Sequence, residues 1–253
     1  MIEKLEWDSR LFGKKMGVIK PDSFSRASIN GDLDLARNEG YEYLVCRLDR
    51  QETLAVKSLE DSGFYLSDVG VTWGVDTDEY LRLWSGKKFD AESSVKEASL
   101  DDIPSLQEMI VSLFPDSRFY SDPFFTREDA DRLHVAWIEN SVKGEAADAV
   151  FHVPEKGFIT CRGSSGRSGS IILVGVREGF RGKSLGSALT VRAMKWFQSR
   201  GVSFVKVKTQ LKNVKAMNFY RRNGFLIHNF DMTFAIMLNN NGHTSKTAEV
   251  DGE

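Results

Sequence analysis

The stretch REGFRGKSLGSALTVRAMKW, residues 177–196, places glycines and basic side chains directly before an apolar pattern with helical spacing. The first N–H groups of a helix lack partners within the helix, and the helix dipole adds partial positive charge there. Gly182 and Gly186 would let an anion approach the backbone, while Arg181 and Lys183 add full positive charges. We therefore expect this loop and helix start to bind a phosphate group.

A second pair of polar residues follows in NVKAMNFYRRNGF. Asn213 and Tyr220 are seven residues apart, so a helix would carry them on one face, separated by about 10 Å along its axis. A tyrosine on such a face also occurs as a plain core residue. Its position beside the basic loop favours a role in a site.

Charge is distributed unevenly along the 253 residues. The whole chain has a net charge of −2, yet residues 177–222 contain twelve lysines and arginines and a single acidic residue, Glu178. A basic sector in an otherwise acidic chain indicates an anion bound locally. A nucleic-acid-binding module stays an alternative, but these charges are not interleaved with stacking aromatics, and we expect no nucleic acid.

Cysteine and histidine give no sign of a cofactor. Cys46 and Cys161 lie far apart, and the four histidines show no metal-ligand spacing, so we expect neither a disulfide framework nor a metal. The longest apolar runs fall well short of the roughly 18 residues that cross a membrane. The first residues also lack the apolar core of a signal peptide. We expect a cytoplasmic protein with no membrane partner.

The periodicity predicts an α/β protein with a mixed sheet. The segment 95–238 should fold in the order strand, helix, helix, three strands, helix, strand, helix, strand. We expect an N-terminal strand–helix–strand domain at 1–76, a charged linker at 77–94 and a disordered tail at 239–253. Residues 52–73 also align without gaps on residues 213–234, which places Glu52 and Leu59 opposite Asn213 and Tyr220. Any activity should therefore belong to the second copy.

Residues 171–189, IILVGVREGFRGKSLGSAL, resemble the acetyl-CoA-binding motif of the GCN5-related N-acetyltransferases (GNAT). The resemblance implies their acyltransferase fold, with the N-terminal part as a smaller half domain, and acetyl-CoA as co-substrate. Ser184 stands where the first glycine of the motif is usual; a positive φ there would cost about 1 kcal/mol. The implied cofactor-binding residues are Val174, Gly175, Val176, Arg181, Gly182, Lys183, Ser184, Leu185, Gly186, Ser187 and Asn213.

By the same resemblance, Tyr220 is the general acid that protonates the departing CoA thiolate. The backbone N–H groups around residues 174–176 would stabilise the tetrahedral intermediate. A phenol titrates near 10 and a thiol near 8.5, so full proton transfer is uphill by about 2 kcal/mol. A hydrogen bond that shortens as the thiolate forms, or acidification of the phenol by the basic sector, would offset this.

Short segments along nearly the whole chain resemble one branch, the dTDP-fucosamine N-acetyltransferases. They include LEWDSRLFG, EDSGFYLSDVGVTW, SRFYSD and TQLKNVKAMNFYRRNGF. The branch implies a nucleotide-linked amino sugar as small-molecule acceptor, polysaccharide synthesis as its use, an acceptor cleft walled by the N-terminal domain, and a homodimer. Asp68 is the candidate base that would take the proton of the amine. The alternative is that Asp68 is simply a solvent-facing residue of a strand.

The segment SRFYSDPFF offers candidate acceptor-binding residues. Arg118 suits a diphosphate, and the rings of Phe119 and Tyr120 suit a base or sugar, although the same aromatics could simply form core. An acetyltransferase acting on a protein or peptide amine, or on another small-molecule amine, stays open as an alternative, as does a non-catalytic CoA-binding protein.

Overall fold

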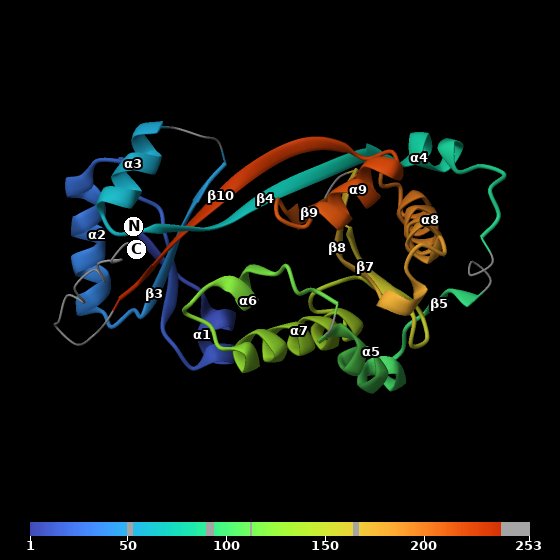
Figure 1. Ribbon diagram of the computed structural model, residues 1–253, viewed down its shortest axis with the longest axis horizontal. Helices are drawn as coiled ribbons and strands as arrows, with labels where there is room; N and C mark the ends of the chain where they lie inside the picture. The colour runs from blue at the N-terminus through green and yellow to red at the C-terminus, as the bar shows by residue number, and fades with distance from the viewer. Residues whose placement is uncertain (50–52, 90–93, 112, 164–166, 239–253) are drawn as a thin grey trace, which may run out of the picture. The chain divides into compact units, whose positions relative to one another are not determined.

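The computed structural model describes residues 1–49, 53–89, 94–111, 113–163 and 167–238, and they form two compact units (Figure 1). Among the described residues, the first unit comprises those within 1–66 together with 233–238, and the second comprises those within 67–232. The predicted tail at 239–253 lies outside the described residues. Within the described ranges, none of the helices combines the length and apolar character needed to cross a membrane.

The first unit is built on a small sheet in the order β1-β2-β3-β10. Strand β1 is antiparallel to β2, and β2 is parallel to β3. Helix α2 buries Ile29, Leu33 and Ala36, which recur at helical spacing, and contacts α3. Its elements are β1 (Ile2–Lys4), α1 (Glu6–Phe12), β2 (Met16–Ile19), α2 (Arg26–Asn38), β3 (Tyr43–Leu48) and α3 (Thr53–Asp61).

The second unit has the strand order β10-β4-β9-β8-β7-β6-β5. Strands β5 to β8 form an antiparallel meander, β8 is parallel to β9, and β9 is antiparallel to β4. The predicted mixed α/β sheet is therefore confirmed. The strands are β4 (Tyr65–Asp76), β5 (Lys96–Glu97), β6 (Ala149–Val153), β7 (Gly157–Gly163), β8 (Ser168–Val176), β9 (Phe204–Gln210) and β10 (Leu226–Met237).

Helices cover both faces of this second sheet. The α-helices are α4 (Thr77–Leu83), α5 (Ile103–Ile110), α6 (Arg118–Ser121), α7 (Arg127–Val142), α8 (Leu185–Ser199) and α9 (Val214–Arg222), with 3₁₀ turns η2 (Leu100–Asp102) and η3 (Glu178–Phe180). Successive side chains of a strand point to opposite faces, and two separate clusters show this alternation. Phe151 of β6 packs with α8, whereas its neighbour Val150 packs with α5 and α7.

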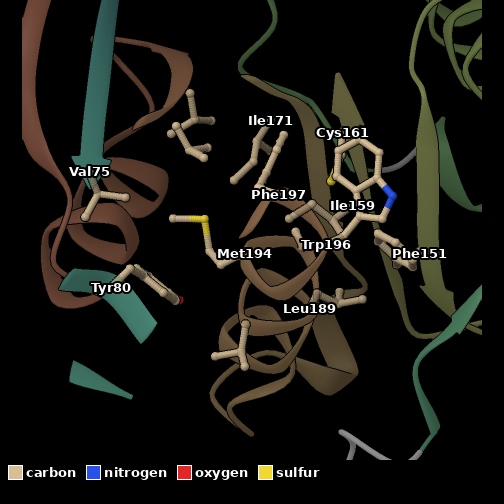
Figure 2. Packing of buried hydrophobic residues seen from close by; sticks show 14 of the residues in the cluster. Val75, Tyr80, Phe151, Ile159, Cys161, Ile171, Leu189, Met194, Trp196 and Phe197 are labelled. Atoms are coloured by element: carbon tan, nitrogen blue, oxygen red, sulfur yellow. The ribbon is translucent and has the colours of Figure 1, made fainter. Parts of the chain in front are cut away.

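The larger cluster joins the strands to α4 and α8 (Figure 2). Val75, Ile159 and Ile171 of three strands lie in it with Met194 and Phe197 of α8. These side chains are almost completely withdrawn from solvent, so α8 is fixed along its length. The cluster therefore holds the beginning of α8, where the predicted phosphate loop ends, in a defined place on the sheet.

The sequence predicts a linker at 77–94, but the first half of this segment forms helix α4 and is part of the second unit. Helix α4 begins at an Asp76 cap, whose carboxylate accepts from the Asp78 and Glu79 N–H groups at 3.0 Å each. Tyr80 is fully buried in the core cluster. The many charges of the segment lie on the exposed side of α4, so a count of charges hides the buried side.

The helices and strands of the two aligned segments begin at matching positions. Helices α3 and α9 begin at Thr53 and Val214, and strands β4 and β10 begin at Tyr65 and Leu226, so both pairs are separated by 161 residues. Each unit is also completed by a strand from the other half of the chain. Strand β4 pairs with β9 in the second unit, and the end of β10 joins the first, where the Leu238 N–H donates to the Glu42 carbonyl oxygen at 2.8 Å.

Candidate active site

Strand β8 leaves its parallel neighbour before it ends. The pairing of β8 with β9 covers residues 168–171, whereas the pairing with β7 continues to Val176. A register shift at Thr160 and Cys161 leaves Ile172 as an extra residue of β8. The last residues of β8 are therefore paired with β7 on one edge, while their other edge is not paired with β9.

Backbone groups on that open edge can be assigned from hydrogen bonds. The Leu173 N–H donates to Thr160 Oγ1 at 2.9 Å and the Arg177 N–H to the Lys156 carbonyl at 2.9 Å, both toward β7 or the turn before it. Because N–H directions alternate along a strand, those of Val174 and Val176 point to the open edge. The structure thus places two backbone donors where the sequence predicted an oxyanion site.

The loop before α8 has the conformation that its glycines allow. Gly182 has φ +74° and Ser184 φ +59°, and Arg181 Nε donates to the Val176 carbonyl at 2.9 Å. Ser184 is the residue before the helix, and among the described residues no side chain caps this end. The N–H groups of the first turn, at Leu185 to Ser187, are therefore open to a ligand. The positive φ also shows that Ser184 carries the strain expected at this position.

Helix α9 positions the second predicted pair. Asn213 caps the helix, because its Oδ1 accepts from the Ala216 N–H at 3.0 Å. Tyr220 is almost fully buried, and its ring packs with Trp73 at a centroid distance of 6.2 Å and with Phe225 at 5.7 Å. The capping bond occupies the amide oxygen of Asn213, so its Nδ2 group is the part that can donate to a bound ligand.

One cavity of about 660 Å³ brings these parts together. Open backbone donors, the helix start and the phenol all lie on its wall, which is the arrangement that the sequence predicted. Of the expected cofactor-binding and catalytic residues, the lining contains Val174, Gly175, Val176, Arg181, Gly182, Ser184, Leu185, Gly186, Ser187, Asn213 and Tyr220. Lys183 is exposed beside the cavity and does not line it.

The phenol of Tyr220 behaves differently from one of the sequence expectations. Burial raises its pKa above the ordinary value of a tyrosine, and no charged group counteracts this among the described residues. Acidification of Tyr220 by the basic sector is therefore wrong: the basic side chains extend into solvent, while the phenol sits among apolar rings. What the structure supports is a phenol that stays protonated and can donate a hydrogen bond.

The predicted acceptor residues form a separate cluster, outside the lining of the cavity. Burial raises the pKa of the Asp68 carboxyl, and nearby Arg118 and Lys212 lower it in part. Lys212 Nζ also donates to Ser121 Oγ at 2.7 Å, which ties the turn before α9 to α6. Asp68 and Arg118 are thus close enough to influence each other, as a common role would require.

The aromatic residues next to Arg118 pack against other rings. Phe119 is buried and packs edge-on with Phe125 at 4.9 Å and Trp137 at 5.7 Å. Tyr120 stacks on His134 at 5.2 Å, and its hydroxyl donates to Asp131 Oδ1 at 2.6 Å. Phe119 is buried and His134 covers one face of the Tyr120 ring, so both rings offer less area to a sugar. The structure therefore favours the core alternative for these two residues.

Several residues of the cavity wall were missed by the sequence reasoning. Five of them lie on α9, and four of these, Lys215, Asn218, Phe219 and Arg222, share one helical face, a signal that the same spacing rule could have found. Trp84, at the end of α4, gives no such signal, because the charged segment around it is typical of a linker. The additional lining residues are Trp84, Leu113, Phe114, Pro115, Asp116, Phe180, Lys215, Ala216, Asn218, Phe219, Arg222 and Asn223. The described residues contain no cluster of three or more metal-binding side chains.

Comparison with known proteins identifies this arrangement. Residues 103–225 match the family model of the acetyltransferase (GNAT) family. A GCN5-related N-acetyltransferase from Sphaerobacter thermophilus has a TM-score of 0.59 at 14% identity, over 93% of this chain and 76% of that one. A conserved protein of unknown function from Staphylococcus epidermidis has a TM-score of 0.60 at 14% identity, over 88% and 83%. Residues 103–225 of the chain are thus similar to the acetyltransferase (GNAT) family.

Curated relatives extend the similarity beyond the matched segment. A dTDP-fucosamine acetyltransferase of Escherichia coli is 22% identical over 246 residues, which is 88% of this chain and 92% of that protein. A mycothiol acetyltransferase of Pseudarthrobacter chlorophenolicus is 29% identical over 60% of this chain and 51% of its own length. The spore coat polysaccharide biosynthesis protein SpsD of Bacillus subtilis is 28% identical over 49% and 44%. The protein is an acetyl-transferring enzyme.

Proposed function

We propose that the enzyme transfers the acetyl group of acetyl-CoA to the amine of a nucleotide-linked amino-deoxysugar. The observation that carries the proposal is the shared cavity, which joins the open edge of β8, the start of α8 and the phenol of Tyr220. The N–H groups of the α8 first turn and Arg181 suit a pyrophosphate, and the edge donors at Val174 and Val176 suit a thioester carbonyl. Tyr220 then lies at the sulfur.

The chemistry follows from these positions. The amine nitrogen attacks the thioester carbon, a C–N bond forms, and the oxyanion of the tetrahedral intermediate accepts hydrogen bonds from the Val174 and Val176 N–H groups. When the C–S bond breaks, the thiolate accepts a hydrogen bond and then the proton of Tyr220. Because burial holds that phenol protonated, it is available as a donor throughout the neutral pH range.

The acceptor class is supported by the relative of nearly equal length, which is a dTDP-fucosamine acetyltransferase. Arg118 and Lys212, beside Asp68, supply positive charge for a diphosphate. The attacking amine must lose a proton, and two carboxylates are candidates for it. Asp68 is the one expected from the sequence, and Asp116 is the one that lines the cavity.

The test is a CoA-release assay with acetyl-CoA and a panel of amines. Nucleotide-linked 3-amino and 4-amino deoxysugars are compared with the same free sugars and with a peptide amine. We expect turnover with a nucleotide-linked sugar and at least a tenfold lower kcat/KM for the free sugar, since the diphosphate contacts are lost. Equal or better turnover of the peptide would overturn the acceptor assignment. The pH–rate profiles of Asp68→Asn and Asp116→Asn show which carboxylate acts as the base: turnover at low and neutral pH should fall most in the variant that lacks it.

A further inference from the structure

Helix α9 presents a stripe of polar side chains to the cavity that the reaction does not use. Lys215, Asn218 and Arg222 all line the cavity, and their spacing of three and then four residues puts them on one helical face. Both basic side chains are exposed, and neither forms an ion pair with a carboxylate in the described part of the chain. The stripe thus offers two charges and an amide for which the described residues provide no recorded partner.

Helix stability alone does not account for this stripe. Arg222 lies in the last turn of α9, where a cation is favourable, but Lys215 lies in the first turn, where the helix dipole opposes it. The first turn of α9 also contains no acidic residue that would compensate. A cation in that position, on the face toward the cavity, indicates an anion that binds there.

The position of the stripe fits one particular anion. A Cβ atom at Gly186 would lie 2.9 Å from the ring of Phe219, so the first turn of α8 is in close contact with α9 between Asn218 and Tyr220. The stripe therefore borders the pyrophosphate position. In coenzyme A the pyrophosphate and the 3′-phosphate are carried by the same ribose, so the two groups must be bound by neighbouring parts of a protein.

We propose that Lys215, Asn218 and Arg222 bind the 3′-phosphate of coenzyme A and make the enzyme discriminate against 3′-dephospho-CoA. A phosphomonoester carries a charge of about −1.5 to −2 at neutral pH and three acceptor oxygens, which matches two cations and an amide donor. The loop before α8 and its helix start are left for the pyrophosphate. This inference rests on the proposed function, since it takes CoA as the ligand of the cavity.

The experiment compares the dissociation constants of CoA and 3′-dephospho-CoA at fixed ionic strength by titration calorimetry. We expect the unchanged protein to bind CoA about tenfold more tightly. In the double variant Lys215→Ala/Arg222→Ala this ratio should fall to near one, while the affinity for 3′-dephospho-CoA changes less than about twofold. Arg221→Ala is the matched control, because Arg221 is an exposed neighbour on α9 that does not line the cavity.

Three results would overturn the inference. They are a ratio near one in the unchanged protein, a ratio that survives the double substitution, and an equal loss in Arg221→Ala, which would show a general field instead of a contact. Failure of the proposed function looks different: neither CoA nor 3′-dephospho-CoA would bind to the unchanged protein. Binding of 3′-dephospho-CoA to each variant shows that the variant is folded.

Discussion

Helices α2 and α8 hold matching places in the two units, and they begin in different ways. Each follows one strand and precedes its parallel neighbour, β2 and β3 in the first unit, β8 and β9 in the second. Ser25 before α2 is extended, and its Oγ accepts from the Ser28 N–H at 3.2 Å. Ser184 before α8 is left-handed and caps nothing. One helix start is closed by its own sequence, and the other is left open to a ligand.

The strand before each helix, and the residue in the position of Tyr220, also differ between the two units. The four residues of β2 are all buried, whereas β8 extends past the end of its pairing with β9. At the position of Tyr220, 161 residues earlier, the first unit has the fully buried Leu59. Duplication of a fold therefore does not duplicate a site. The proposed site combines an uncapped helix, a free strand edge and a phenol, and in the described residues of the first unit a capped helix, a buried strand and a leucine stand in these places.

The largest effect should come from making Tyr220 more like its counterpart. In Tyr220→Phe the ring keeps its packing with Trp73 and Phe225, but the proton donor is lost. We expect kcat to fall by about 10² to 10⁴, with the affinity for acetyl-CoA within about twofold of the unchanged protein. Steady-state CoA release and direct binding measure the two quantities. Turnover near the original level would show that Tyr220 is not the acid.

Two glycines should respond in opposite ways. Gly186→Trp puts a large side chain into the cavity against Phe219, and we expect the dissociation constant of CoA to rise at least tenfold, since the ring displaces the ligand. Gly31 in α2 faces open space, so Gly31→Ala should leave CoA binding unchanged and stabilise the protein by up to about 1 kcal/mol. Unaltered CoA affinity in Gly186→Trp would contradict the cofactor position.

Acid should weaken the second unit through two buried histidines. Burial lowers the pKa of His134 and of His152 below the ordinary 6.5, although Asp102 beside His152 opposes the shift. Below pH 6.5 the unfolded chain then binds more protons than the folded one, so the free energy of unfolding decreases. Urea unfolding between pH 7.5 and 5 measures this, with the exposed His228→Gln as control. A flat profile would exclude the effect.

The smallest effect concerns the two serines before the helices. Ser184→Gly removes a left-handed non-glycine residue and should raise the free energy of unfolding by about 1 kcal/mol, with CoA binding preserved. Ser25→Ala should lower it by about 1 kcal/mol, because a helix cap is lost. Thermal or urea unfolding, with and without CoA, measures the change in the free energy of unfolding of each variant. A loss of stability in Ser184→Gly would mean that the serine side chain has a partner in solution.

Local patterns were enough to predict many of the residues that line the cavity. Each of two patterns depends on a single helix, so its geometry follows from local sequence. One is the run of glycines and cations before α8, and the other is the spacing of seven residues between Asn213 and Tyr220. The acceptor side could not be read in the same way. Phe119 and Tyr120 look available in sequence, and only the fold shows that Trp137, Phe125 and His134 cover them.

Tertiary packing also explains what the chain pattern missed. Tyr80 and Trp84 belong to a charged segment, and their inward direction is set by α8, which lies more than a hundred residues later. The same is true of the raised pKa of Tyr220, since a net charge summed along the sequence says nothing about which phenol is surrounded by rings.

The exchange of β4 and β10 has a consequence for biosynthesis. Residues 67–232 separate the two parts of the first unit, so its sheet cannot close before the last strand has left the ribosome. The early half must wait with an unpaired edge beside β3, exposed to other nascent chains. We expect that a truncation that removes β10 would leave the sheet of the first unit incomplete, even if every residue of the cavity were present.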